Sequence, residues 1–415
     1  MPRVAPDLTP GRIAKMRTLA KWVPGDHLGL DVPADADALR DGGAGYLTEA
    51  FRRAGTLSDA NAVVAIEDLT EFRGGSTGRK ALLSVRYRQS CELPRDLFVK
   101  FSRDFDDPGR DLGRDQMADE VRFALLTRAP GFPIDVPQCL FADFHHGSGS
   151  GLLITSRIGY GSNGIEPHYD KCADYSMPDP PAHYRALLRA LARLAGTHKA
   201  GGLAAEMEFP VDMRRLSVGE RAPYTGEQLQ RRVDHLAELV ARHSGLLPAN
   251  IAAPQFISRL RDEILLCPDR VDALWDALCA DPRYVALCHW NANVDNAWFW
   301  RDPHGRLECG LLDWGCVGQM NVAMAIWGTM CSSETQMWNT DFDSLLGYFV
   351  AEFAAAGGPE LDPRALRGHV LTYAAIMGPA WLLDVPAYLL KVLPEPVADR
   401  FAPGSPGTSR PAAGC

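Results

Sequence analysis

The spacing of hydrophobic residues changes along the 415-residue chain from the period of strands to that of helices, and this change constrains the fold more than any other feature. From residue 63 onward, the segments AVVAIEDL, ALLSVRYR and DLFVKFS show the two-residue period of β-strands. From residue 184 onward, the chain carries the 3.6-residue period of helices, interrupted only by a short strand pair near residues 297–312. The sequence therefore predicts an α+β fold with two lobes, in which a small antiparallel sheet precedes a mainly helical part.

Local composition marks the boundaries of these parts. A helix at residues 115–128 and two more strands, PQCLFADFHH and GLLITSRI, complete the predicted sheet lobe. The first sixty residues carry helical patterns in a basic amphipathic stretch and in the segment YLTEAFRRA. The predicted organisation is an N-terminal helical extension (1–60), the sheet lobe (61–158), an irregular connecting segment rich in Gly and Pro (159–182), the helical lobe (183–400) and a disordered tail (401–415).

The composition excludes several classes of protein. With 46% hydrophobic and 23% charged residues, the chain has the balance of a folded globular protein. Its 52 acidic and 43 basic side chains give a formal charge of -9 without a dense Lys/Arg block, so nucleic acid is not expected as a partner. The ten cysteines lack the paired spacing of a zinc site, and neither a signal peptide nor a span of about 18 apolar residues is present. We therefore expect a cytoplasmic protein with no membrane partner.

The most informative stretch is residues 287–314, LCHWNANVDNAWFWRDPHGRLECGLLDW, which predicts a loop followed by a β-hairpin. The central D-P-H-G has the residue preferences of a type I turn. Folding back about this turn brings the start of the first strand beside the end of the second, so Asn296 and Asp313 become neighbours. One amide oxygen and one carboxylate suit a hard divalent cation such as Mg²⁺, which takes its remaining ligands from water and phosphates.

This stretch resembles the aminoglycoside phosphotransferase and choline kinase-like family, whose pattern is H-G-D-x-x-x-x-N, a hairpin, and then I-D-W. The present chain has H-W-N-A-N-V-D-N and L-L-D-W, retaining His289, Asn296, Asp313 and Trp314 at the family's spacing. The resemblance spans roughly residues 60–345 and implies a two-lobed protein kinase-like fold. It also implies that Asn296 and Asp313 bind the Mg²⁺ ions that bridge the phosphates of ATP or GTP.

The sheet lobe supplies the other residues that the resemblance implies for nucleotide binding. Lys100, in the strand DLFVKFS, matches the family's strand lysine that neutralises the α- and β-phosphates, and Glu120 on the next helix would hold it extended. The glycine-rich segment RGGSTGR would lie over the phosphates. The expected cofactor-binding residues are Gly74, Gly75, Ser76, Thr77, Gly78, Lys100 and Glu120, together with Ser156 and Ile158 of the hinge that contacts the base.

The chain departs from the family at the catalytic position. Asn291 stands where the family has its catalytic aspartate, and an amide can orient an acceptor hydroxyl but cannot take its proton. Asp295, in the same loop, is a candidate base in its place. Trp290 replaces the family's glycine, and its ring should narrow the acceptor pocket or pack against it.

Three functions are compatible with this altered motif. The first is an atypical ATP-dependent phosphotransferase that acts on the hydroxyl of a small molecule, with Asn291 orienting the acceptor. The second is a nucleotide-binding pseudokinase that serves as a regulatory or partner-binding module. The third is adenylyl transfer, which would release pyrophosphate in place of ADP. The sequence favours the first, because a pure scaffold has no physical need of the lysine, the glutamate and both metal ligands; it leaves the acceptor and the oligomeric state open.

Overall fold

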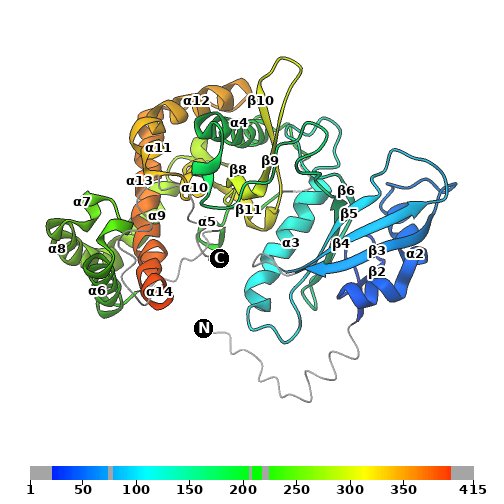
Figure 1. Ribbon diagram of the computed structural model, residues 1–415. Coiled ribbons are helices and arrows are strands. Elements are labelled where there is room, and N and C mark those ends of the chain that lie inside the picture. Colours follow the sequence, from blue (N-terminus) through cyan, green and yellow to red (C-terminus); the bar gives the residue numbers. More distant parts are fainter. Residues whose placement is uncertain (1–20, 73–77, 205–207, 217–223, 394–415) are drawn as a thin grey trace.

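The computed structural model describes residues 21–72, 78–204, 208–216 and 224–393 of the chain (Figure 1). A five-stranded antiparallel sheet with two helices forms one lobe, and a mainly helical part with two short two-stranded sheets forms the other. The predicted two-lobed α+β fold is therefore confirmed.

The sheet lobe has the strand order β3-β4-β5-β7-β6. Helix α2 (Ala36–Arg53) packs on one face of the sheet, and α3 (Arg110–Leu126) packs on the other (Figure 1). Alternation along the strands separates these faces, because side chains at i and i+2 point the same way. The strands are β3 (Val63–Phe72), β4 (Arg79–Tyr87), β5 (Asp96–Phe101), β6 (Cys139–His145) and β7 (Ser150–Ser156).

A short hairpin precedes this sheet, where helix had been expected. Strands β1 (Trp22–Pro24) and β2 (Asp31–Pro33) pair antiparallel, and the buried carboxylate of Asp143 accepts the N–H groups of His27 and Leu28 at 2.9 Å each. Strands of three residues are too short to show a period, which is why the sequence pattern missed them. Residues 10–20 of the amphipathic stretch and the tail at 401–415 lie outside the described residues.

The helical lobe is built around α4 (Pro180–Lys199), whose buried side chains contribute to the large core of this lobe. Helix α12 and strands β8 and β10 pack against it. The other helices are α5 (Met213–Leu216), α6 (Gly226–Arg242), α7 (Ala249–Ala252), α8 (Pro254–Glu263), α9 (Cys267–Cys279), α10 (Val322–Met330), α11 (Thr335–Thr340), α12 (Phe342–Ala355), α13 (Pro363–Ala380) and α14 (Val385–Val392).

Two small sheets in this lobe position the loops of the site. The predicted hairpin is present as β9 (Ala297–Arg301) and β10 (Leu307–Leu311). The second pair, β8 (Val285–His289) with β11 (Val317–Asn321), was not predicted. All five residues of β8 are buried, so the segment lacks the alternation that reveals a half-exposed strand. The loops that leave β8 and β10 therefore meet beside each other.

The connecting segment after β7 is fastened to the hairpin. Glu166 donates its backbone N–H to the Phe299 carbonyl at 2.8 Å, and Tyr160 donates its hydroxyl to the Ala297 carbonyl at 3.2 Å. The Glu166 carboxylate also lies 2.8 Å from His183 Nε2. This segment therefore runs along β9 and forms one wall of the space between the lobes.

One stretch, Pro363–Val392, is long and apolar enough to cross a membrane by length and composition alone. Core helices of soluble proteins meet the same criterion, and 39% of the tested window is buried inside the protein. The stretch includes a short 3₁₀ turn, Leu382–Asp384, between α13 and α14.

Candidate nucleotide-binding site

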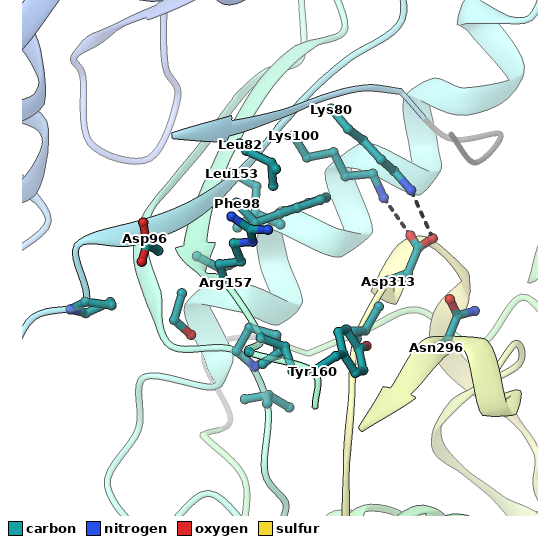
Figure 2. Close-up of a pocket in the computed structure, with 18 of the residues that line it drawn as sticks. Lys80, Leu82, Asp96, Phe98, Lys100, Leu153, Arg157, Tyr160, Asn296 and Asp313 are labelled. Carbon is teal, nitrogen blue, oxygen red and sulfur yellow. Dashed lines mark hydrogen bonds and ion pairs between the residues drawn. The ribbon is translucent and has the colours of Figure 1, made fainter. Parts of the chain in front are cut away.

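A cavity of about 1010 Å³ lies between the sheet lobe, the connecting segment and the β9–β10 hairpin. Leu82, Phe98 and Leu153 of the sheet give it an apolar wall (Figure 2). At its other end, Lys80 and Lys100 converge on Asp313, with Asn296 alongside (Figure 2). The cavity thus joins an apolar compartment to a charged one.

Lys100 is placed by the alternation of β5. Leu97, Val99 and Phe101 enter the core of the sheet lobe, so Lys100 emerges on the opposite face. Its Nζ lies 2.6 Å from Glu120 Oε2 and 2.7 Å from Asp313 Oδ1, although its side chain is only 1% exposed. Burial alone would lower the pKa of Lys100, but the two carboxylates raise it above its ordinary value. The ammonium is therefore held in its charged form.

Asp313 occupies a backbone conformation that few residues adopt. Its φ of 60° and ψ of 64° are left-handed, a region that aspartate and asparagine tolerate better than most side chains. Its Oδ2 lies 3.6 Å from the Nζ of Lys80. Burial would raise the pKa of Asp313, but Lys100 and Lys80 hold it below its ordinary value. The carboxylate is consequently ionised and faces two cations.

His289 ties the two loops together as a neutral side chain. Its Nδ1 accepts the backbone N–H of Asn291 at 3.1 Å, so its Nε2 carries the proton and donates to the Leu312 carbonyl at 3.0 Å. Burial lowers the pKa of His289 to about 4. The imidazole therefore fixes the loop before β9 against the loop after β10.

Asn296 and Asp313 form a donor set that suits Mg²⁺. Asn296 donates its side-chain amide to the Asn291 carbonyl at 2.9 Å, which turns the amide oxygen toward the cavity beside Asp313 (Figure 2). The part of the chain that the structure describes has no group of three or more His, Cys, Asp or Glu side chains arranged to hold a metal. A cation here would take its other ligands from water and phosphates, as Mg²⁺ commonly does.

The side chain of Asn291 is hydrogen-bonded to that of Asn293. Asn293 is fully buried, and turning its amide lets the nitrogen donate to three acceptors: the carbonyls of Gly328 at 3.0 Å and Thr329 at 3.3 Å, and Ser332 Oγ at 3.0 Å. In this orientation the oxygen of Asn293 faces the side chain of Asn291, so the amide of Asn291 must also be turned to present its nitrogen as the donor. An amide at position 291 satisfies this network, whereas an ionised carboxylate could not donate.

Asp295 lines the cavity and keeps one oxygen without a partner. Its Oδ1 is buried and has no hydrogen bond to any described residue, while its backbone carbonyl accepts from His168 Nε2 at 3.1 Å. Burial raises the pKa of Asp295. A carboxylate with an unused, buried oxygen and a raised pKa can accept a proton, the property that Asn291 lacks.

The hinge and the glycine-rich segment differ in how much of them can be described. Ser156 donates its N–H to the Gln138 carbonyl, and its hydroxyl oxygen accepts the Gln138 N–H, each at 2.9 Å. The N–H of Ile158 has no hydrogen bond within the described residues. Of the glycine-rich segment, Gly78 is described, and a Cβ there would lie 2.2 Å from the Phe101 carbonyl oxygen. The other four expected residues lie outside the described residues: Gly74, Gly75, Ser76 and Thr77.

Two residues of this region were missed or left undecided by the sequence. Lys80 was not predicted, although its alternation with buried Ala81 on β4 could have placed it on the face of the cavity. The ring of Trp290 lies in the core, where it donates to the Tyr373 hydroxyl at 2.6 Å and packs beside Trp327 and Trp381. Trp290 therefore supports the loop from behind.

The loop is also braced by Gly328 of α10, where a Cβ would lie 1.8 Å from the Trp290 carbonyl oxygen. We expect Gly328→Ala to lower the free energy of unfolding by about 1–3 kcal/mol, because loop and helix must separate. Urea denaturation measures the change. Gly347→Ala in α12 is the matched control, because beyond its own helix backbone and chain neighbours a Cβ there meets no atom of the described residues within 4 Å. Equal stability of the two variants would contradict the close packing of α10 against the loop.

The sequence matches no protein-family model and no curated protein. Several solved structures are similar to the fold. A wild-type aminoglycoside 2'-phosphotransferase in complex with GDP is 16% identical, with 80% of this chain and 87% of that chain covered and a TM-score of 0.39. An ethanolamine kinase from Plasmodium vivax is 13% identical, with 93% of this chain and 90% of that chain covered and a TM-score of 0.41. A microcompartment-associated aminopropanol kinase is 12% identical, with 83% of this chain and 98% of that chain covered and a TM-score of 0.39.

Proposed function

We propose that this protein binds a nucleoside triphosphate with Mg²⁺ and transfers the terminal phosphoryl group to a hydroxyl of a small molecule. The observation that carries the proposal is the buried network of Lys100, Glu120 and Asp313 at the charged end of an apolar cavity. Burying such charges has a large desolvation cost, and replacing them by apolar residues is often neutral or stabilising. A site for phosphates gives the network a purpose that stability alone does not.

The cavity offers a place for each part of a nucleotide. The apolar wall of Leu82, Phe98 and Leu153 suits a purine base, and the N–H of Ile158 is free to donate to it. Lys100 suits the α- and β-phosphates. Asn296 and Asp313 would hold Mg²⁺, which when bound neutralises phosphate charge. Both ATP and GTP fit this description.

In the transfer itself, the acceptor oxygen bonds to the γ-phosphorus as the bond from that phosphorus to the bridging oxygen breaks, and ADP or GDP leaves. Asn291 orients the acceptor hydroxyl through its amide oxygen, and Asp295 takes the proton. A loose transition state asks more of positioning and charge neutralisation than of the base. The absence of aspartate at position 291 is therefore compatible with turnover.

The amide network around Asn291 favours one alternative, a nucleotide-binding module without turnover. Since Asn293 requires a donor at position 291, the loop is adapted to an amide and not to a catalytic carboxylate. Such a module would bind nucleotide through the same residues and act through a partner.

Calorimetry with ATP and GTP, each with Mg²⁺, tests the site, and a screen of small hydroxyl compounds then tests the chemistry. Binding followed by acceptor-dependent release of ADP or GDP would support the proposal. Binding without turnover would favour the non-catalytic module, and release of pyrophosphate would indicate adenylyl transfer. Absence of binding at millimolar nucleotide would overturn the proposal.

The loop also gives a prediction for Asn291→Asp. The new carboxylate would face the oxygen of Asn293, so we expect a loss of about 1–3 kcal/mol in the free energy of unfolding. The loss should shrink in the Asn293→Ala background, where the opposing oxygen is gone. Denaturation of the two single variants and the double variant measures this coupling. Stability equal to that of the wild type would show that the side chain of Asn291 does not act as a donor.

A further inference from the structure

Lys80 lies directly opposite Lys100 in the sheet. Strands β4 and β5 are antiparallel, and their register pairs Lys80 with Lys100 and Leu82 with Phe98. Directly opposed side chains share a face of the sheet, and like charges in such a pair destabilise it. Two lysines at this position therefore require compensating negative charge.

The positive charges of Lys80 and Lys100 are fully compensated only while Asp313 faces both lysines. The four charges of Lys80, Lys100, Glu120 and Asp313 sum to zero. Lys100 keeps Glu120 as its own partner at 2.6 Å. Lys80, whose side chain is 12% exposed, makes its one ion pair within the described residues with Asp313, at the longer distance of 3.6 Å. If Asp313 turned to a metal ion, Lys80 alone would be left without an anion.

Lys80 also sits where the terminal phosphates of a nucleotide would lie. It is the second residue of β4, next to the end of the glycine-rich segment, and its Nζ points to the charged end of the cavity (Figure 2). We propose that Lys80 is a second phosphate-binding lysine, which contacts the β- and γ-phosphates of a nucleoside triphosphate when Asp313 engages Mg²⁺. This inference rests on the proposed function and adds to it a residue that selects for the number of phosphates.

A purely structural role makes the opposite prediction. If Lys80 served only to neutralise Asp313, its removal would free that carboxylate of a competing cation. Binding of a nucleotide with Mg²⁺ would then strengthen or stay the same. If Lys80 binds phosphate, its removal weakens binding, and more so for nucleotides with more phosphates.

The test measures the affinities of ATP, ADP and AMP, each with Mg²⁺, for the wild type, Lys80→Met and Lys80→Arg by calorimetry. Lys391→Met is the matched control, because this lysine is exposed on α14, far along the chain from the cavity. Thermal unfolding checks that each variant folds, and Lys80→Gln takes the place of Lys80→Met if the latter does not.

We expect Lys80→Met to weaken the binding of ATP by about 10- to 100-fold, which corresponds to the loss of one charge-assisted contact. The affinity for AMP should stay within about twofold of the wild-type value. Lys80→Arg should retain most of the ATP affinity, and Lys391→Met all of it. ATP affinity that is unchanged or raised in Lys80→Met, or an equal loss for ATP and AMP, would overturn the inference while the proposed function stands. Absence of binding of both ATP and GTP by the wild type would overturn both.

Discussion

Lys100→Met is expected to lower the free energy of unfolding by about 3–5 kcal/mol in the absence of nucleotide, the usual cost of leaving a buried charge without its partner. Methionine has nearly the length of lysine and no charge, so packing is largely preserved. What is lost is the cation between Glu120, whose side chain is 5% exposed, and Asp313. Urea denaturation of the nucleotide-free protein measures the change.

The double variant Lys100→Met/Glu120→Gln separates this electrostatic loss from a loss of packing. With the glutamate neutral, the buried carboxylate that lacked a partner is gone, so part of the stability should return. Asp313 keeps Lys80 within 3.6 Å in both variants and should not need rescue. If the double variant were no more stable than Lys100→Met, the loss would come from packing and not from an unpaired charge.

The sequence predicted the parts of the fold whose periodicity is long enough to recognise. Strands β3 to β5 and helices α3 and α4 show two- or 3.6-residue periods, and β6 and β7 are seven-residue segments, buried but for the last residue of each, that are long enough to recognise as strands. Strands β1 and β2 have three residues each, and β8 is buried throughout, so none of them carries an alternation. These strands form because of contacts that the local sequence does not report, such as the carboxylate of Asp143 that holds the turn between β1 and β2.

The same limit separates the predicted residues of the site from those that were missed. Asn296 and Asp313 could be paired because a recognisable turn fixes the register of one hairpin. Alternation along β4 could place Lys80 on the cavity face, but it could not place Lys80 opposite Lys100, because that pairing depends on the register between β4 and β5, which are joined by a longer connection. The hydrogen bond between Asn291 and Asn293 could not be predicted from the local sequence, because its orientation is set by carbonyl groups at the end of α10.

We expect Asp313→Asn to weaken the binding of ATP with Mg²⁺ by about 100-fold or more, since even the groups that only support metal ligands are commonly worth 10- to 100-fold in metal affinity. Asparagine keeps the size of the side chain and tolerates the left-handed backbone at φ 60°. It removes the negative charge, the property that a hard cation requires. Asp313→Ala would add the strain of an alanine in a left-handed conformation, so the asparagine variant gives the cleaner result. Calorimetry with Mg²⁺ measures the loss.

The same ATP titration in the presence of a metal chelator should reverse the order of ATP affinity between the wild type and Asp313→Asn. Without a cation, Asp313 in the wild type places a negative charge beside the phosphates and occupies Lys100 and Lys80. In Asp313→Asn neither ammonium group faces that negative charge, although Lys100 keeps Glu120 as a partner, so metal-free ATP should bind the variant at least as tightly as the wild type. A loss of affinity that is equal with and without Mg²⁺ would mean that Asp313 acts by holding the loop in shape, because only a ligand of the metal makes its contribution depend on the metal.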